Sequence, residues 1–330
     1  MANIKVAVID DWQNAAGDLI DWSPLQQRAD ITFFQRHFAA GEEDTAARLL
    51  GEFDVILLTR ERSRFSEALI GKLPKLKMLS CTGSRAPNVD LEAATKRGIV
   101  CTLTSGGHSP APAAEMSLAM LLAAARKVPQ GDASIRAGRF QEGVAPGITL
   151  EHRTLGIVGL GRIGAYMARY GQALGMRVIA WSQNLTAEKA KAAGAELVTK
   201  EQLFSESDAV TIHLVLGPRS RGLIGAADFG RMKKGAIFIN TSRGPIVDEA
   251  ALLAAIREGR IIAALDVFDK EPLPADNPFR GLPNTVLTPH LGFTTEEGLQ
   301  AFYKPAMENI LAFLDGKPVN LMNPDVMKKN

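Results

Sequence analysis

A glycine-rich turn in the middle of the chain constrains its fold more than any other feature. Its glycines, Gly159, Gly161 and Gly164, have the spacing G-x-G-x-x-G. The apolar run Thr154–Gly159 precedes the turn, and an amphipathic segment follows it. In such a strand–turn–helix, the glycines permit the tight turn, the approach of the backbone to a pyrophosphate and the packing of the helix on the strand. The context predicts a dinucleotide-binding βαβ unit; a glycine-rich turn without a ligand is the alternative.

Short Val- and Ile-rich runs alternate with amphipathic segments along the whole chain. This alternation predicts βαβ units with parallel sheets, and near-continuous apolar strands are expected where helices cover both faces of a sheet. The expected strands of the first half are Ile4–Asp10, Ile31–Phe34, Asp54–Leu58, Lys77–Cys81 and Gly98–Cys101, and those of the second half are Thr154–Gly159, Arg177–Trp181, Ala195–Val198, Ala209–Leu214, Ala236–Asn240, Ile261–Val267 and Thr285–Thr288.

The length of 330 residues predicts two domains. Gly, Ser and Pro cluster at Thr102–Ala113, which indicates a hinge or a domain boundary. The next segment, Ala113–Arg126, is apolar nearly all round, so we expect a helix buried between domains or between subunits. The tail at Thr294–Leu314 is typical of one more amphipathic helix.

Composition excludes several classes of protein. Lys and Arg number 38 against 36 Asp and Glu, which gives a net charge of +2 and disfavours a nucleic acid or an anionic membrane as partner. The two cysteines, Cys81 and Cys101, exclude a disulfide framework and suit a reducing compartment. The start resembles no secretion signal, and the apolar run Met116–Ala125 is too short to span a bilayer. We therefore expect a soluble, cytoplasmic protein.

The strand after the glycine turn should end beside an adenosine ribose. An acidic residue there favours NAD, and a nearby arginine accommodates the 2′-phosphate of NADP. This strand ends in Trp181 and is followed by Ser182, Gln183 and Asn184, which are neutral. Neutral side chains can hold ribose hydroxyls but leave a phosphate unpaired. The sequence favours NAD and leaves NADP open.

Four polar residues follow strands in the last third of the chain. Arg243, Asp266, Glu271 and His290 each lie at the C-terminal end of an expected strand or in the loop after it. Ligands bind at that edge of an open α/β sheet. Arginine offers a planar fork for a carboxylate, and histidine exchanges a proton near neutral pH. Glu271 could hydrogen-bond His290 and orient it.

Together these motifs resemble the D-isomer-specific 2-hydroxyacid dehydrogenase family, in its formate/glycerate dehydrogenase-like group. The resemblance covers nearly the whole chain and is strongest at Thr154–Gly292. It implies two Rossmann-like or flavodoxin-like, doubly wound parallel-sheet domains with a cleft between them. Residues 1–104 with 295–330 would form a discontinuous substrate domain, and residues 105–294 the NAD(P)-binding domain. The resemblance also implies a homodimer joined through the nucleotide domain.

The resemblance implies a D-2-hydroxy acid and its 2-oxo acid as substrates. His290 would be the acid and base, paired with Glu271, and Arg243 would bind the substrate carboxylate and polarise the carbonyl. Asp266 would contact the nicotinamide carboxamide. The positions that match the family's cofactor-binding residues are Gly159, Gly161, Arg162, Ile163, Gly164, Ser182, His213, Val215, Ser220, Thr241, Asp266, His290 and Gly292.

The loop Thr82–Asp90 matches the segment whose backbone amides hold the substrate carboxylate. We expect Gly83, Ser84 and Arg85 to bind substrate together with Arg243 and His290. Arg85 stands where the family has a second glycine. A dicarboxylic, phosphorylated or larger polar 2-oxo acid would be favoured if Arg85 faced the cleft; otherwise Arg85 is a solvated loop residue. Val215 also departs from the family, which often has proline there.

Structural roles remain open for several of these residues. Arg243 could form a salt bridge at a helix start, Asp266 and Arg243 could pair without touching substrate, and His213 could satisfy a buried backbone group. The histidines have no metal-ligand spacing, so we expect no metal site.

Other functions are open as well. Glu271 argues against a formate dehydrogenase, whose histidine lacks a glutamate partner. A phosphoglycerate dehydrogenase-like enzyme is one alternative. An NAD(H)-sensing binding protein, similar to the corepressors that use the dehydrogenase fold, is another.

Overall fold

The fold is that of a computed structural model, which describes residues 3–104 and 109–328. The chain divides into unit 1, residues 1–108 with 295–330, and unit 2, residues 109–294. The expected hinge at Thr102–Ala113 lies partly outside the described residues. Within the described ranges, no helix is long and apolar enough to cross a membrane.

Unit 1 contains a five-stranded parallel sheet in the order β2-β1-β3-β4-β5. The chain winds outward from β1 in both directions, which is the flavodoxin-like doubly wound order. The C-terminal helix α13 returns to this unit and packs on β4. The elements are β1 (Ile4–Ile9), α1 (Ala16–Leu19), α2 (Ser23–Gln26), β2 (Ala29–Phe33), α3 (Glu43–Leu50), β3 (Val55–Leu58), α4 (Glu67–Gly71), β4 (Met78–Cys81), α5 (Leu91–Lys96), β5 (Val100–Leu103), α13 (Glu296–Leu314) and the 3-10 helix η3 (Pro324–Lys328).

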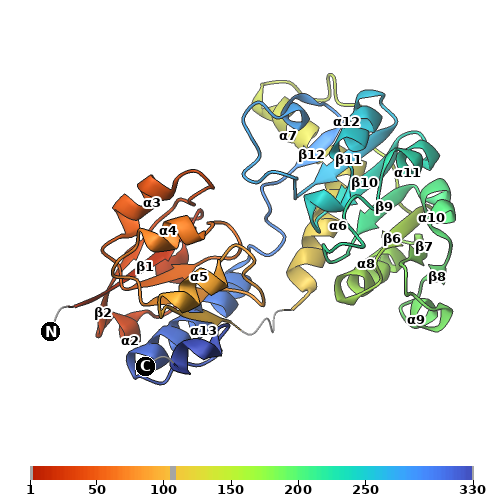
Figure 1. Cartoon of the computed structure of the whole chain (residues 1–330). Helices are drawn as coiled ribbons and strands as arrows, with labels where there is room; N and C mark the ends of the chain where they lie inside the picture. Colours follow the sequence, from red (N-terminus) through yellow and green to blue (C-terminus); the bar gives the residue numbers. More distant parts are fainter. Residues whose placement is uncertain (1–2, 105–108, 329–330) are drawn as a thin grey trace. The chain divides into compact units, whose positions relative to one another are not determined.

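Unit 2 contains a seven-stranded parallel sheet in the order β12-β11-β10-β9-β6-β7-β8 (Figure 1). Read from β8, this is the Rossmann order with one more strand. Its elements are α6 (Ala111–Arg126), α7 (Val128–Arg136), β6 (Thr154–Val158), α8 (Arg162–Ala173), β7 (Arg177–Trp181), α9 (Ala187–Ala192), β8 (Glu196–Leu197), α10 (Lys200–Glu206), β9 (Ala209–Ile212), α11 (Ala226–Arg231), β10 (Ala236–Asn240), η1 (Gly244–Ile246), α12 (Glu249–Arg257), β11 (Ile261–Leu265), η2 (Pro278–Gly281) and β12 (Thr285–Leu287).

Each face of the unit 2 sheet carries its own apolar core. Ile237 and Ile239 of β10 pack in the core that α6 and α8 cover. Phe238, between them, packs in the core that α10, α11 and α12 cover. Successive side chains of a strand point to opposite faces, and burying each large one stabilises the fold by about 1.5–3 kcal/mol. The two cores confirm the expectation of strands buried on both faces.

Within the chain, helix α6 buries one side, and the expected burial of Ala113–Arg126 between domains or subunits stays a prediction. The helix begins at Ala111, and its residues Ser117 and Leu121 face the core. Glu115 and Leu122 lie on the opposite side and are exposed within the chain. Ala113–Arg126 contains many alanines. Alanine makes a segment apolar, but its small side chain does not need to be buried on every side of the helix.

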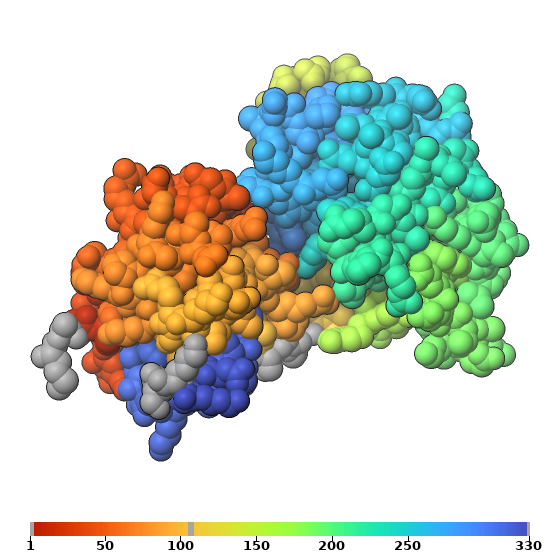
Figure 2. Space-filling model, viewed as in Figure 1, coloured from red at the N-terminus to blue at the C-terminus, as the bar shows by residue number. Residues whose placement is uncertain are grey.

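The edge of the unit 2 sheet is shorter than expected. The predicted strand Ala195–Val198 is reduced to β8, whose two residues are exposed. Glu196 pairs there with Arg177 at 2.6 Å, in solvent. Helix α9 packs on β8 and projects at the lower right of both views (Figure 1, Figure 2). The helices α1 and α2, of four residues each, were not predicted, since they are too short to show a period.

Candidate functional site

The glycine turn forms a cradle that side chains would fill. Gly159 follows β6 with φ +97°, and a Cβ there would lie 2.5 Å from the carbonyl oxygen of His213. A Cβ on Gly164 would collide with the carbonyl oxygen of Gly159. The Gly159 amide donates to the Trp181 carbonyl oxygen at 2.9 Å, which fixes the start of the turn. The turn therefore requires glycine at both positions.

Helix α8 begins directly after the turn. Gly161 is its N-cap and brings no side chain to cap the first turn. A Cβ placed on Gly161 would meet no described atom within 4 Å outside its neighbours, so the space above it is open. Arg162 and Ile163 are the first helical residues, where N–H groups and the helix dipole favour an anion. These residues fit the pyrophosphate of a dinucleotide.

A pocket of about 540 Å³ lies at the carboxyl ends of β7 and β9. Strand β6, which leads into the glycine turn, runs between these two strands. The structure brings Ser182, Val215 and Ser220 together in the lining, next to Trp181. The volume lies in the range of small-molecule sites, so the pocket fits the adenosine half of a dinucleotide.

His213 and Ser220 make contacts inside their own loop. His213 Nε2 lies 2.9 Å from Thr211 Oγ1, and burial lowers the pKa of His213 to about 3, so its ring is neutral. The Ser220 hydroxyl donates to the Val215 carbonyl oxygen at 2.7 Å and accepts from the Gly217 amide at 2.9 Å. Both side chains stabilise the segment around the end of β9, whose following loop lines the pocket.

His290 pairs with Glu271. His290 Nδ1 lies 2.6 Å from Glu271 Oε2, and the other carboxylate oxygen accepts from the Phe268 amide at 2.9 Å. Burial acts to raise the pKa of Glu271. The hydrogen bond and charge of His290, with the Phe268 amide and the Arg243 charge, outweigh it and hold that pKa below its ordinary value. Glu271 therefore stays ionised beside the imidazole and orients it.

Asp266 anchors the segment that carries His290. Its carboxylate is buried and accepts from Thr288 Oγ1 at 2.6 Å and from the amides of Leu291 and Gly292 at 2.8 and 2.9 Å. Its carbonyl oxygen accepts from the His290 amide at 2.8 Å. His290 itself has φ +56°, a strained region for a histidine. The structure thus shows Asp266 holding this strained backbone.

Arg243 stands on a turn locked against the loop of Glu271. The Asn240 side chain accepts from the Ser242 amide at 3.0 Å and donates to the Arg243 carbonyl oxygen at 3.1 Å. A Cβ on Gly244 would collide with the backbone of Phe268, so the turn and that loop touch directly. The close approach explains how Arg243 comes near enough to lower the pKa of Glu271.

Thr241 links the same turn to helix α6. Its hydroxyl lies 2.6 Å from the hydroxyl of Ser117, which also donates to the Ala113 carbonyl oxygen at 2.7 Å. The end of β10 is therefore fixed to α6 as well as to the loop after β11.

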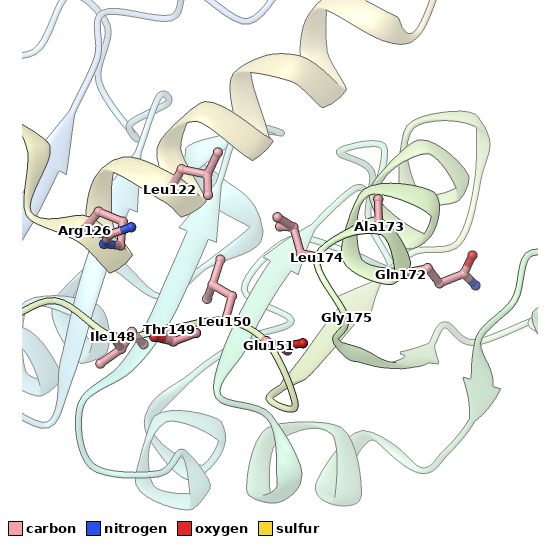
Figure 3. A pocket seen from close by; sticks show the side chains of 10 residues that line it. All are labelled: Leu122, Arg126, Ile148, Thr149, Leu150, Glu151, Gln172, Ala173, Leu174 and Gly175. Carbon is pink, nitrogen blue, oxygen red and sulfur yellow. The ribbon is translucent and has the colours of Figure 1, made fainter.

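A second hollow of about 500 Å³ lies at the other edge of the unit 2 sheet (Figure 3). Residues 148–151 lead into β6, and Leu174 and Gly175 lead into β7, so the hollow is at the amino ends of the strands. Leu122 and Arg126 reach it from the last turns of α6 (Figure 3). None of the predicted site residues, all of which are described, lines this hollow.

Comparisons with known proteins agree with this geometry. The sequence model of the family described as "D-isomer specific 2-hydroxyacid dehydrogenase, NAD binding domain" matches residues 118–292. Glyoxylate reductase from Aeropyrum pernix is 42% identical over 281 residues, 82% of this chain and 84% of that protein. The chain belongs to the D-isomer-specific 2-hydroxyacid dehydrogenase family.

Some of the relatives are longer than this chain. D-3-phosphoglycerate dehydrogenase from Archaeoglobus fulgidus is 39% identical over 264 residues, which are 80% of this chain but 50% of that protein. The chain thus spans about half the length of the phosphoglycerate dehydrogenase. The crystal structure of a phosphoglycerate oxidoreductase from Vibrio cholerae O395 is 32% identical, covers 95% of this chain and 99% of its own, and has a TM-score of 0.88.

The family match confirms the predicted resemblance, the two parallel-sheet α/β units, the NAD-binding domain and the oxidoreductase class. The predicted substrate loop lies in unit 1 of this dehydrogenase. There the Gly83 amide donates to Thr104 Oγ1 at 2.7 Å, and Ser84 and Arg85 are exposed. That these three residues act with Arg243 and His290 stays a prediction.

Sequence reasoning missed residues that hold the site without reacting. Asn240 and Ser117 bind the turn that carries Thr241 and Arg243, and Gly244 admits the neighbouring backbone. Asn240 ends the otherwise apolar strand β10, three residues before Arg243, and an asparagine at the end of such a strand is a signal that could have identified it. Ser117 lies in an alanine-rich helix and gives no such signal.

Proposed function

We propose that this D-2-hydroxyacid dehydrogenase reduces a 2-oxo acid to the D-2-hydroxy acid with NADH. The observation that carries the proposal is the pair of His290 Nδ1 and Glu271 Oε2 at 2.6 Å. The pair stands on the same carboxyl edge of the sheet as the glycine turn that fits a dinucleotide. The reverse oxidation uses the same groups with their roles reversed.

His290 would donate the proton. Glu271 binds Nδ1, so Nε2 is the ring nitrogen left for the substrate oxygen. In the reduction, the imidazolium gives its proton to the oxygen that gains charge, and Glu271 stabilises the imidazolium before the transfer. Asp266 and the Phe268 amide hold the two partners in place. Asp266 is proposed to contact the nicotinamide as well.

Arg243 would bind the substrate. Its planar guanidinium would form two parallel hydrogen bonds with the carboxylate of a 2-oxo acid, and its charge would polarise the carbonyl. Bound NADH would supply the hydride. Gly83, Ser84 and Arg85 are proposed to hold the substrate carboxylate from unit 1.

The substrate class is proposed from the relatives. Glyoxylate reductases align over most of their length, which supports a small 2-oxo acid. Phosphoglycerate dehydrogenases at 39% identity favour D-3-phosphoglycerate as a second candidate. The cytoplasmic location predicted from the sequence stays a prediction.

A homodimer through unit 2 is also proposed. Exposed apolar side chains recur along residues 122–140, from the exposed side of α6 onward: Leu122, Val128, Ile135 and Phe140 are exposed to 36%, 56%, 58% and 70%. Such a group of apolar side chains is typical of a surface that another subunit covers. Analytical ultracentrifugation should give twice the chain mass, and Ile135→Glu should lower it; a monomer at all concentrations would contradict the proposal.

The experiment that tests the proposal compares two histidines with similar backbone conformations. His290 and His152 both have positive φ, +56° and +62°, and asparagine tolerates that conformation. NADH consumption is followed with glyoxylate, hydroxypyruvate, pyruvate, phenylpyruvate, 2-oxoglutarate and oxaloacetate, and NAD reduction with D-3-phosphoglycerate. His290→Asn should lower kcat by about 10²–10⁴-fold and leave NADH binding intact. His152→Asn should change neither.

Unchanged kcat in His290→Asn would overturn the assignment of the proton donor. No turnover of any substrate by the wild type, with NADH bound, would favour the NAD(H)-sensing alternative instead.

A further inference from the structure

We propose that the pocket at the carboxyl ends of β7 and β9 also accepts NADPH, and that Arg219 binds its 2′-phosphate. The inference rests on the proposed function, since it concerns the nucleotide site of the same enzyme. Arg219 follows β9 rather than β7 and was not among the residues predicted from the sequence. It lines the pocket together with Ser182, Gln183 and Asn184.

The charge of the pocket carries the inference. Its described lining includes no aspartate or glutamate, and Arg219 is the residue there with a charged side chain. A carboxylate at the end of the second strand would bind the ribose hydroxyls and repel a phosphate in their place. Ser182, Gln183 and Asn184 provide hydrogen-bonding groups without that repulsion. The electrostatics of the lining therefore favour an added phosphate.

The loop holds the Arg219 backbone against the end of β7. Gln183 Nε2 donates to the Arg219 carbonyl oxygen at 3.4 Å, which joins the two segments that form the pocket wall. Ser220, the next residue, is buried, and its hydroxyl closes the loop through Val215 and Gly217. The Arg219 side chain is exposed, so its guanidinium can reach a phosphate at the pocket mouth.

Lys200 does not supply the same charge. Its ammonium lies 6.0 Å from the centre of the Trp181 ring, behind the pocket wall. It donates to Asp228 Oδ2 at 2.8 Å and to the Leu223 carbonyl oxygen at 2.7 Å. Because Lys200 is paired in this way, we assign the phosphate to Arg219.

The experiment measures binding of two nucleotide fragments to the full chain by isothermal titration calorimetry. Adenosine 2′,5′-bisphosphate carries the extra phosphate, and 5′-AMP lacks it. The wild type should bind the bisphosphate at least as tightly as 5′-AMP. Arg219→Gln should weaken the bisphosphate about tenfold, as expected for a charge-assisted contact, and leave 5′-AMP within about twofold. Arg257→Gln, at an exposed site on α12, is the matched control and should change neither.

Any of four results would overturn the inference. The wild type could bind the bisphosphate much more weakly than 5′-AMP. Arg219→Gln could leave bisphosphate binding unchanged or weaken both fragments equally. Binding of neither fragment would remove the nucleotide site itself. A wild type that binds the bisphosphate through Arg219 but reduces no 2-oxo acid would instead contradict the proposed function and leave this inference standing.

Discussion

The two edges of the unit 2 sheet contain hollows of similar volume but opposite character. The carboxyl edge has a pocket of about 540 Å³ beside the glycine turn, and the amino edge has one of about 500 Å³. Helix α8 begins at the first edge and ends at the second, where α6 also ends. Helix N-termini favour anions, whereas C-termini present carbonyl oxygens and disfavour them. The direction of the helices, more than the size of a hollow, therefore indicates where a phosphate-bearing ligand binds.

Two aspartates extend the comparison. Asp266 at the carboxyl edge and Asp208 at the amino edge each accept backbone amides, from Leu291 and Gly292 in one case and from Thr154 in the other. Only Asp266 supports a segment with a proposed catalytic residue. Replacing each should therefore separate an effect on catalysis from an effect on stability.

Among the replacements that test this comparison, the largest effect is expected for Asp266→Ala. Three donors would lose their acceptor and the strained His290 would lose its anchor. We expect kcat to fall about 100-fold, as for a catalytic group displaced by about 1 Å, and the unfolding free energy to fall by about 2–3 kcal/mol. Steady-state kinetics and urea unfolding measure the two quantities. Asp266→Asn keeps one acceptor and should be intermediate in both; wild-type kcat in the two variants would show that the anchor is dispensable.

Glu271→Gln should have the next largest effect. Without the anion, the imidazolium form of His290 loses its partner, so reduction should slow about tenfold at neutral pH. The lowered pKa of Glu271 keeps this carboxylate ionised at neutral pH, so the wild type should lose kcat at acid pH as Glu271 becomes protonated, and the variant should lack this loss. A pH profile of kcat is the measurement. A slower enzyme with an unmoved profile would mean that Glu271 positions His290 without stabilising its charge.

The smallest effect is expected for Asp208→Asn at the amino edge. Burial acts to raise the pKa of Asp208, but the Thr154 amide, Lys233 and Arg153 outweigh it and lower that pKa. Because the pKa of Asp208 is lowered in the folded state, the ionised carboxylate stabilises the fold at pH values above its ordinary pKa of 3.8. This contribution is lost as the pH falls below that pKa. The variant should lose about 1–2 kcal/mol at pH 7 and less near pH 3, with kcat unchanged. A reduced kcat would contradict the expectation that the aspartate at the amino edge supports stability but not catalysis.

Local patterns in the sequence predicted most of the fold. The strands from Thr154–Gly159 onward and the glycine turn are recognisable because a buried parallel strand and its turn are each encoded by adjacent residues. The short helices α1 and α2 were not predicted, because four residues are too few to show a helical period. Burial of the exposed side of α6 by another subunit stays a prediction, because apolarity along one segment does not report what packs against it.

The sequence predicted which residues belong to the candidate site better than it predicted their hydrogen-bond partners. Glu271 and His290 were expected to pair, and their side chains do lie within hydrogen-bonding distance. The expected contact of Asp266 with the nicotinamide stays a prediction. What the sequence did not reveal is that its carboxylate binds the segment of residues 288–292, more than 20 residues along the chain. Arg219 was not predicted because it follows β9, whereas a residue that contacts the ribose is expected at the end of β7.

The contact of Gly244 with the Phe268 backbone has a consequence for motion. The turn of Arg243 and the loop of Glu271 cannot separate by rotating side chains, because backbone meets backbone between them. They should therefore open as one cooperative unit, with amide hydrogens that exchange with solvent at a common rate. The residue proposed to bind substrate and the residue proposed to orient the proton donor would then become available, or be withdrawn, in a single step.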